Sequence, residues 1–431
     1  MRSADESSSF WWRAHDDEPP AGPGWWPIGE ASYREREVRI TGHHFLEGPA
    51  PAWADDLLRV ARAAFLADKL VAREPTADRW TRNLRLSVPV SEPERWQEDG
   101  GAGDVVESLL GVLTGDRWEL LTRVLPSQPA QAPLPSGRDW RPDEIALFSG
   151  GLDSLSWAAE RAAVAGQGPL LLVGFHEPKA RDVQQRVHEA VKSRARESGR
   201  RVLRLTPSQM PRGEGGRKTV ELSSRPRGLL YVATAVRAAA ASRVASVQIP
   251  ENGQVALNPP LTAARTSALS TRSVHPWSLH LLNSAIRDIG GAVTVTNPLA
   301  RLTKGEVCRK ALDARISPTV LADTLSCGHP PIRRGRKYTN CGVCFPCLVR
   351  RSGILAACGF DATDYEKEPW DQKLSARRRR DWHALRLWLA RPYGIRDIIA
   401  DQPLPPDTDI ASWLRVVRAG RAELRNLVGP E

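Results

Sequence analysis

The sequence contains no run of about 18 uninterrupted apolar residues, which a membrane-spanning helix requires. Its first twenty residues, MRSADESSSFWWRAHDDEPP, also lack the apolar centre of a secretory signal peptide. Both absences argue against a membrane protein or a secreted protein. We therefore expect a cytoplasmic location and no membrane partner.

Cysteine is scarce, with six residues in a chain of 431. So few cysteines do not form a disulfide framework, and in a reducing compartment a cluster of them is typical of metal binding. Four cysteines lie in one short segment that includes CGVCFPC. Two overlapping CxxC turns and a further thiolate predict a tetrahedral sulfur site, for which zinc is favoured and an iron–sulfur cluster is the alternative. The predicted ligands are Cys327, Cys341, Cys344 and Cys347. The other two, Cys308 and Cys358, are interpreted as core residues.

A Walker A sequence, GxxxxGK followed by Ser or Thr, is also absent, which argues against ordinary transfer of a terminal phosphoryl group. The chain has a different glycine turn, SGGLDS, between the apolar segment IALF and the helical pattern SWAAERAAVA. Adjacent glycines let backbone N–H groups approach a phosphate, and the helix N-terminus that follows adds a partial positive charge. A plain strand-to-helix turn is the alternative. The predicted ATP-binding residues are Ser149, Gly150, Gly151, Leu152, Asp153 and Ser154. Asp153 is expected to cap the helix and to orient the loop or Mg²⁺.

Alternating apolar strands and helices over residues 143–360 predict an α/β fold with a parallel, doubly wound sheet. Residues 1–125 mix strand and helix patterns and are interpreted as an α+β accessory domain. Five prolines in residues 126–142 predict a linker. Residues 361–431 are expected to form a helical, basic region. The formal net charge of +11 favours polyanionic ligands in general, so nucleic acid remains a weakly supported partner.

The SGGLDS turn and the segment TLSC…NCGVCFPCLVRRSG together resemble QueC, the 7-cyano-7-deazaguanine synthase family of PP-loop ATP pyrophosphatases. The resemblance covers residues 143–360 and implies an adenine nucleotide alpha hydrolase-like fold that binds ATP, Mg²⁺ and Zn²⁺. In this family a substrate oxygen attacks the α-phosphorus of ATP and pyrophosphate leaves. The segments RPRGLLYVATAV and NPLARLTKGEV resemble family segments that place Arg227 and Lys304 beside the phosphates. Asp153, Lys304 and Arg227 are accordingly the catalytic candidates.

The segment that would carry the family's substrate site differs, reading IPENGQVALNPPLTAARTSALSTRSVHPW. Glu251 and Asn252 follow a predicted strand, VASVQI, and could read a base edge. Arg272 and His275 lie later in the segment and could meet a carboxylate or an adenylate. An ordinary polar loop with a helix cap is an equal alternative for each of the four.

The resemblance implies that a 7-deazaguanine-type carboxylate is adenylated and then attacked by an amine. The flanking regions add surface for a protein partner, so the amine is expected to belong to a protein or another large acceptor. This architecture resembles the elaborated QueC-like proteins of bacterial antiphage systems such as Qat, in particular QatC. Two other functions stay open, namely a tRNA-modifying PP-loop enzyme and a zinc-stabilised module that senses ATP without catalysis.

Overall fold

The computed structural model describes residues 7–14, 18–22, 24–29, 33–34, 49–126, 141–175, 180–207, 210–211, 220–221, 223–261, 269–328, 330, 339–401 and 403–429. The sequence EVRI near Val38, which is typical of a strand, and most of the predicted proline-rich linker lie outside this part. Of the helices that are described, none is long and apolar enough to cross a membrane.

The described strands are β1 (Ser8–Trp12), β2 (Trp25–Ile28), β3 (Tyr33–Arg34), β4 (Asn83–Val90), β5 (Arg117–Val124), β6 (Glu144–Leu147), β7 (Leu170–Val173), β8 (Val202–Leu205), β9 (Met210–Pro211), β10 (Ser246–Gln248) and β11 (Thr294–Thr296).

The described helices are α1 (Ala52–Leu70), α2 (Glu94–Gln97), α3 (Ala102–Thr114), α4 (Leu152–Ala162), α5 (Arg181–Ser198), α6 (Arg227–Ser242), α7 (Gly253–Leu257), the 3₁₀ helix η3 (Leu269–Val274), α8 (Pro276–Asp288), α9 (Lys304–Asp313), α10 (Pro318–Ala322), α11 (Phe345–Cys358), α12 (Ala376–Ala390), α13 (Ile395–Asp401) and α14 (Ile410–Val428).

Five parallel strands form the larger sheet, in the order β11-β10-β6-β7-β8. The first of them along the chain, β6, lies in the middle, and the later strands extend the sheet first to one side and then to the other. Helices α4 and α5 pack on one face, and α6 and α8 pack on the other. This is the α/β, doubly wound arrangement that the alternating pattern predicts. Strand β7 is buried along its whole length, as expected for the interior of a sheet covered on both faces.

The N-terminal sheet, in the order β2-β1-β4-β5, is also parallel at every described pairing. The α+β prediction for residues 1–125 is therefore wrong, and this region is α/β. The reason is the connection from β4 to β5, which runs through α3 and so returns the chain in the same direction. The alternating pattern of NLRLSVPV indicates a strand but does not specify the direction of its partner.

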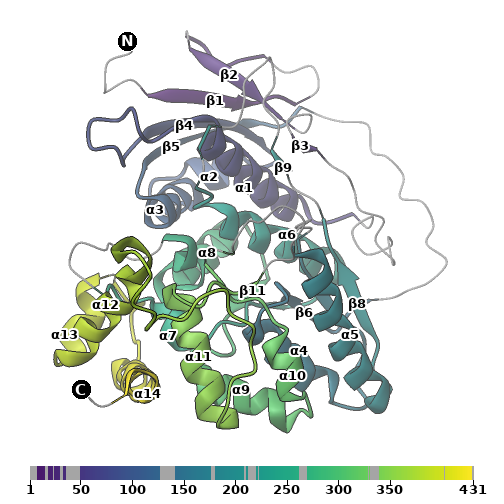
Figure 1. Cartoon of the computed structure of the whole chain (residues 1–431). Helices are drawn as coiled ribbons and strands as arrows, with labels where there is room; N and C mark the ends of the chain where they lie inside the picture. Colours follow the sequence, from purple (N-terminus) through teal and green to yellow (C-terminus); the bar gives the residue numbers. More distant parts are fainter. Residues whose placement is uncertain are drawn as a thin grey trace.

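The two sheets lie in one stack of layers (Figure 1). Helices α1 and α3 cover the N-terminal sheet and pack directly on α6 and α8, which in turn cover the five-stranded sheet. A single apolar core continues through these layers, from Leu57 and Leu110 to Leu230 and Ile286. Through α1 and α3, the N-terminal region therefore packs on the helices that cover one face of the larger sheet.

Polar contacts reinforce this junction at the segment that precedes α6. The Lys69 ammonium donates to the carbonyl oxygen of Ser223 at 2.6 Å and to that of Glu221. The Arg225 guanidinium donates to the Thr114 carbonyl and lies 3.9 Å from the Trp80 ring centre. The N-terminal region therefore holds the segment that leads into Arg227.

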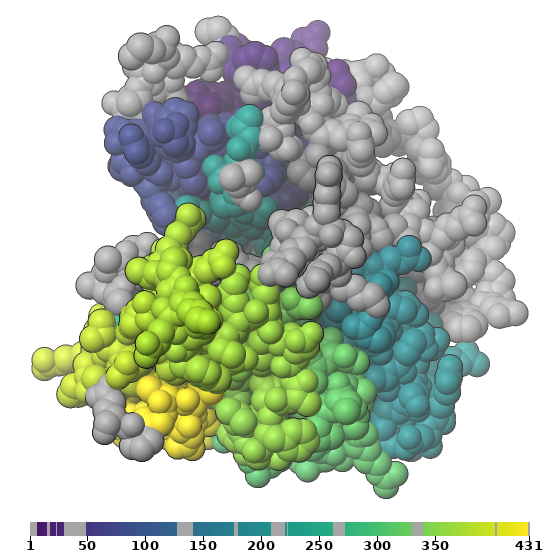
Figure 2. Space-filling view, in the orientation of Figure 1, coloured from purple at the N-terminus to yellow at the C-terminus, as the bar shows by residue number. Residues whose placement is uncertain are grey.

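The C-terminal helices pack on the same body. Helix α14 contacts α7, α9 and α11, and α12 contacts α11. In the space-filling view the yellow of the C-terminal residues lies directly beside the yellow-green and green of the residues before them (Figure 2). The buried side of α14 includes Trp413, Val416, Val417 and Leu424. Helices α12, α13 and α14 occupy most of residues 376–428, as predicted, whereas residues 361–375 are not helical.

Candidate active site

The SGGLDS turn joins β6 to α4 at the carboxyl end of the central strand. Gly150 has a φ of +79°, a backbone conformation that side chains other than glycine rarely adopt. A Cβ at this position would lie 3.1 Å from the Cα atom of Gln184. The Gln184 amide donates to the carbonyl oxygens of Ser149 and Phe175, at 3.3 and 3.2 Å. Gln184, which the sequence analysis missed, fixes the turn against the next strand.

The first turn of α4 keeps backbone N–H groups directed at the loop. Gly151 is the N-cap residue, and no side chain caps the helix. The prediction that Asp153 caps α4 is therefore wrong. The Ser149 hydroxyl accepts from the Gly151 N–H at 3.2 Å, and the Ser154 hydroxyl donates to the Gly151 carbonyl at 3.1 Å. Both serines thus shape the turn itself.

Strand β10 lies beside β6, and the residues that follow it reach the same end of the sheet. The Asn252 amide nitrogen lies 3.1 Å from Asp153 Oδ2 and 3.0 Å from Glu251 Oε1. Asn297, which follows β11, holds the Glu251 backbone through hydrogen bonds of 3.1 and 2.8 Å. Three adjacent strands therefore deliver polar groups to one place, at the point where the strand order reverses. Open α/β sheets bind ligands at this position.

Lys304, the first residue of α9, completes the cluster. Its ammonium lies 2.6 Å from Asp153 Oδ2, and its side chain is 3% exposed. The other oxygen, Asp153 Oδ1, is buried and accepts no hydrogen bond as long as the neighbouring Glu251 is ionised, whereas a protonated Glu251 is close enough to donate to the Asp153 carboxylate. A buried carboxylate oxygen without a partner is costly, so this atom is a natural ligand for a cation or a donor.

The three ionisable groups of the cluster, Asp153, Glu251 and Lys304, have pKa values shifted in different directions. Burial acts to raise the pKa of Asp153, but the ammonium of Lys304 and the neighbouring hydrogen bonds hold this pKa below its ordinary value. Burial and the adjacent Asp153 charge raise the pKa of Glu251 well above normal. Burial alone would lower the pKa of Lys304, yet the Asp153 carboxylate raises it. The cluster is therefore an ammonium–carboxylate pair beside Glu251, a carboxyl group that holds its proton more tightly than an ordinary glutamate does.

Backbone contacts around Lys304 come from elements distant in sequence. Thr303 and Glu306 form a capping box at the start of α9. The Lys304 N–H donates to Gln254 Oε1 at 2.7 Å, and the Gly305 N–H donates to Glu423 Oε2 at 3.1 Å. The contributions of Gln254 and Glu423 are further features that the sequence analysis missed, because no local pattern marks them.

The remaining predicted residues occupy different positions. Arg227 opens α6, is exposed, and lies 5.8 Å from the Tyr231 ring centre. The Arg272 guanidinium donates to the Val112 carbonyl of α3 at 3.0 Å. His275 is the N-cap of α8 and accepts from the Trp277 N–H through Nδ1 at 3.1 Å. The structure brings together Asp153, Glu251, Asn252 and Lys304, whereas Arg272 and His275 bind other parts of the fold.

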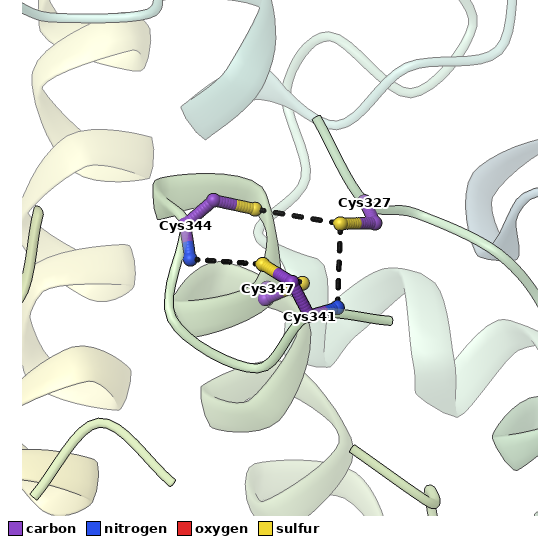
Figure 3. A group of neighbouring side chains, drawn as sticks. All are labelled: Cys327, Cys341, Cys344 and Cys347. Atoms are coloured by element: carbon purple, nitrogen blue, oxygen red, sulfur yellow. Dashed lines mark hydrogen bonds between the residues drawn. The ribbon is translucent and has the colours of Figure 1, made fainter. Parts of the chain in front are cut away.

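The four predicted metal ligands form one cluster, with their sulfur atoms turned toward a common centre (Figure 3). All four sulfur atoms lie within 4.8 Å of one another. The pairs Cys327–Cys344 and Cys341–Cys347 have Sγ–Sγ distances of 3.8 and 3.9 Å. Tetrahedral zinc with Zn–S bonds of about 2.3 Å requires sulfur atoms about 3.8 Å apart, so the cluster fits zinc. The other two cysteines lie outside it, with Cys308 buried and Cys358 partly buried.

The cysteine cluster is linked to the glycine turn by a short chain of hydrogen bonds. The Ser326 hydroxyl, next to Cys327, accepts from the Leu152 N–H at 3.4 Å. The Ser326 N–H donates to Asn340 Oδ1 at 3.1 Å, next to Cys341. Two metal-ligating segments are thus tied to each other and to the first turn of α4. Ser326 is a functional candidate that its position beside a ligating cysteine could have indicated.

The site combines the backbone N–H groups at the start of α4, the Lys304 ammonium and the carboxyl groups of Asp153 and Glu251 at the switch point of a parallel sheet. Such a set can bind a polyphosphate and the divalent cation that accompanies it.

Comparison with known proteins gives a partial match. No family model matches the chain. Over 76 residues the sequence is 42% identical to the 7-cyano-7-deazaguanine synthase of Novosphingobium aromaticivorans. This aligned stretch is 18% of this chain and 30% of the relative. The chain thus matches less than a third of that protein's length. The match makes part of the chain similar to a 7-cyano-7-deazaguanine synthase, and the four-cysteine cluster is a separate feature that fits zinc.

Proposed function

We propose that this protein is a PP-loop ATP pyrophosphatase that adenylates a 7-deazaguanine-type carboxylate and passes the acyl group to an amine. The observation that carries the proposal is the convergence of the SGGLDS turn, Asp153 and Lys304 at the switch point of the sheet. The match to a 7-cyano-7-deazaguanine synthase supports the choice of substrate class.

In the proposed first step, a carboxylate oxygen of the substrate attacks the α-phosphorus of ATP. The bond between the α-phosphorus and the bridging oxygen breaks, and pyrophosphate leaves with the bond's electron pair. The N–H groups at the start of α4 bind the pyrophosphate oxygens, and the Lys304 ammonium stabilises the charge that develops on them. The buried Asp153 Oδ1 would hold Mg²⁺, which neutralises phosphate charge when bound.

In the second step, an amine attacks the acyl carbon and AMP departs, which leaves an amide. AMP is a much better leaving group than oxide, which is why the carboxylate must first be activated. Glu251 and Asn252 lie beside Asp153 and would contact the substrate or its adenylate. Arg227 would reach the phosphates from the start of α6. The four cysteines would hold Zn²⁺ as a structural ion, which fixes Ser326 against the turn.

The amine is proposed to belong to a protein acceptor within a bacterial antiphage system. Support comes from architecture, because the N-terminal sheet and helices α12 to α14 add surface beyond the catalytic region.

The test is to incubate the purified protein with Mg²⁺, ATP and 7-carboxy-7-deazaguanine, with and without ammonia, and to identify products by mass spectrometry. We expect AMP and pyrophosphate that depend on the base, and their loss in Lys304→Met. Formation of free nitrile at an ordinary enzymatic rate with ammonia would contradict the protein acceptor. Production of ADP, or formation of AMP at the same rate with and without the base, would contradict the proposed reaction. Salt-sensitive tRNA binding with tRNA-dependent AMP would favour the tRNA-modifying alternative.

A further inference from the structure

The C-terminal helix α14 lies against the elements that carry Lys304, far from it in sequence. One carboxylate oxygen of Glu423 accepts from the Thr303 hydroxyl, and the other accepts from the Gly305 N–H at 3.1 Å. The residues on either side of Lys304 are therefore both bound to one side chain of α14. Burial raises the pKa of Glu423, which agrees with its enclosed position between the helices.

The backbone of Lys304 itself is held by Gln254, and the Gln254 side chain packs against α14. The Lys304 N–H donates to Gln254 Oε1 at 2.7 Å. Gly420 faces Gln254 so closely that a Cβ at position 420 would overlap the glutamine side chain. Glycine is thus required there because the two helices approach each other, although its backbone needs no positive φ.

Further contacts fix the same helix in place. The Arg415 guanidinium donates to Glu306 Oε1 at 2.8 Å and to the Arg301 carbonyl. The Val416 side chain lies where a Cβ on Gly253 would need to go. Helix α14 therefore packs against both segments that meet in the Gln254–Lys304 hydrogen bond.

We infer that α14 is a positioning element for the catalytic site, and that Glu423 and Gly420 set the position from which the Lys304 ammonium reaches Asp153. The inference deepens the proposed function and rests on it for the identity of the ligand. Glu423 is a positioning residue that acts through Lys304. Helix α14 lies outside residues 143–360, the region that resembles QueC, so this role belongs to the extension.

The first test measures ATP affinity by calorimetry in the full chain. Glu423→Ala and Gly420→Ala are expected to weaken ATP binding about tenfold, since each removes or displaces hydrogen bonds that fix Lys304. Glu423→Gln keeps an acceptor for the Gly305 N–H and is expected to stay within about twofold of wild type. Arg418→Ala is the matched control, because Arg418 is an exposed residue of the same helix.

A double-mutant cycle shows whether the effect passes through Lys304. In a Lys304→Met background, Glu423→Ala is expected to weaken ATP binding no further. An equal loss in both backgrounds would overturn the inference, because Glu423 would then act by some other route.

The second test needs no ATP. Acetylation of lysines is followed by mass spectrometry, and Lys304, being buried, is expected to react slowly in wild type. Glu423→Ala is expected to accelerate its labelling at least about threefold, with Glu423→Gln and Arg418→Ala unchanged. If Glu423→Ala does not fold, Glu423→Asp replaces it. Unchanged labelling would refute the role of α14, whereas a wild-type protein that fails to bind ATP would refute the proposed function alone.

Discussion

The two oxygens of Asp153 are in different situations. Oδ2 is shared by Lys304 and Asn252, while Oδ1 is buried and accepts no hydrogen bond unless the neighbouring Glu251 is protonated. The pair of charges satisfies one side of the carboxylate and leaves the other open to a ligand. A buried ion pair of this kind contributes little to stability by itself, so its retention here agrees with a role in binding.

Gly150→Ala tests the backbone of the turn. The methyl group would meet Gln184 and would adopt a φ of +79°, so we expect ATP affinity to fall at least about tenfold. Gly166→Ala is the control, because Gly166 has a φ of +74° with open space around its Cβ position. Calorimetric titration with ATP measures the difference. Equal losses of ATP affinity in the two variants would contradict a specific effect at the turn, because Gly166 lies beyond the other end of α4.

His275 gives the protein a predictable response to acid. Burial, with the nearby charge of Arg272, lowers the pKa of His275 to about 4, so the folded state disfavours its protonation. Because the unfolded state binds the proton more readily, the stability due to neutral His275 is complete above about pH 6.5 and is lost as the pH falls toward 4. Between pH 7.5 and 5.5 this loss is roughly 1 kcal/mol.

His275→Asn, which keeps a helix-capping acceptor, is expected to remove that part of the pH dependence. Urea unfolding of both proteins at the two pH values measures it. His188, whose pKa burial also lowers to about 4, remains in both proteins, so the variant still shows some acid sensitivity. An unchanged pH dependence would contradict the assignment to His275.

The SGGLDS turn and the four cysteines are predictable because each is a continuous or closely spaced pattern whose chemistry is local. Gln184, Gln254 and Glu423 are not, because each acts through contacts with residues far away in the chain, and glutamine or glutamate on a helix has no distinguishing pattern. Arg272 and His275 are polar residues just before a helix, a position that is equally typical of structural contacts. Their binding to Val112 and Trp277 could be found only from the fold.

Among the elements, the entry to α11 depends most directly on the cysteine cluster. Cys344 is the N-cap of α11 and Cys347 lies in its first turn, while Cys327 and Cys341 reach it from other segments. A metal ion would join these segments, and the hydrogen bond to Ser326 would link them to the SGGLDS turn.

Cys341→Ser is therefore expected to reduce bound metal from about one ion per chain toward zero, and to lower the melting temperature by several degrees. Mass spectrometry of metals gives the content, and visible absorption distinguishes an iron–sulfur cluster from colourless zinc. Cys358→Ser is the control, since Cys358 lies outside the cluster. Full metal content in Cys341→Ser would contradict the assigned ligand set.

On the scale of the whole molecule, the stack of layers makes the N-terminal region and the larger sheet interdependent. Helices α1 and α3 cover apolar faces of α6 and α8 that would otherwise meet water. The alternation of strands and helices predicts the parallel, doubly wound sheet, but it does not predict this docking, because an amphipathic pattern does not specify which surface its apolar face will cover.

Removal of residues 1–126 is therefore expected to make the remaining chain aggregate, because it exposes a large apolar patch. Expression of residues 1–126 as a separate chain in the same cells is expected to restore soluble protein that co-purifies with it. Size-exclusion chromatography of both preparations provides the measurement. A soluble, monomeric truncated chain with an unchanged melting temperature would show that the shared core contributes little.

Helix α14 also fixes when the site is completed during synthesis. The ribosome makes the glycine turn and the central strand early, whereas Glu423 and Gly420 emerge after every strand of both sheets. A nascent chain can therefore assemble its sheets while Lys304 is still without its support. Loss of this one helix would leave the SGGLDS turn in place but remove the contacts that hold Lys304.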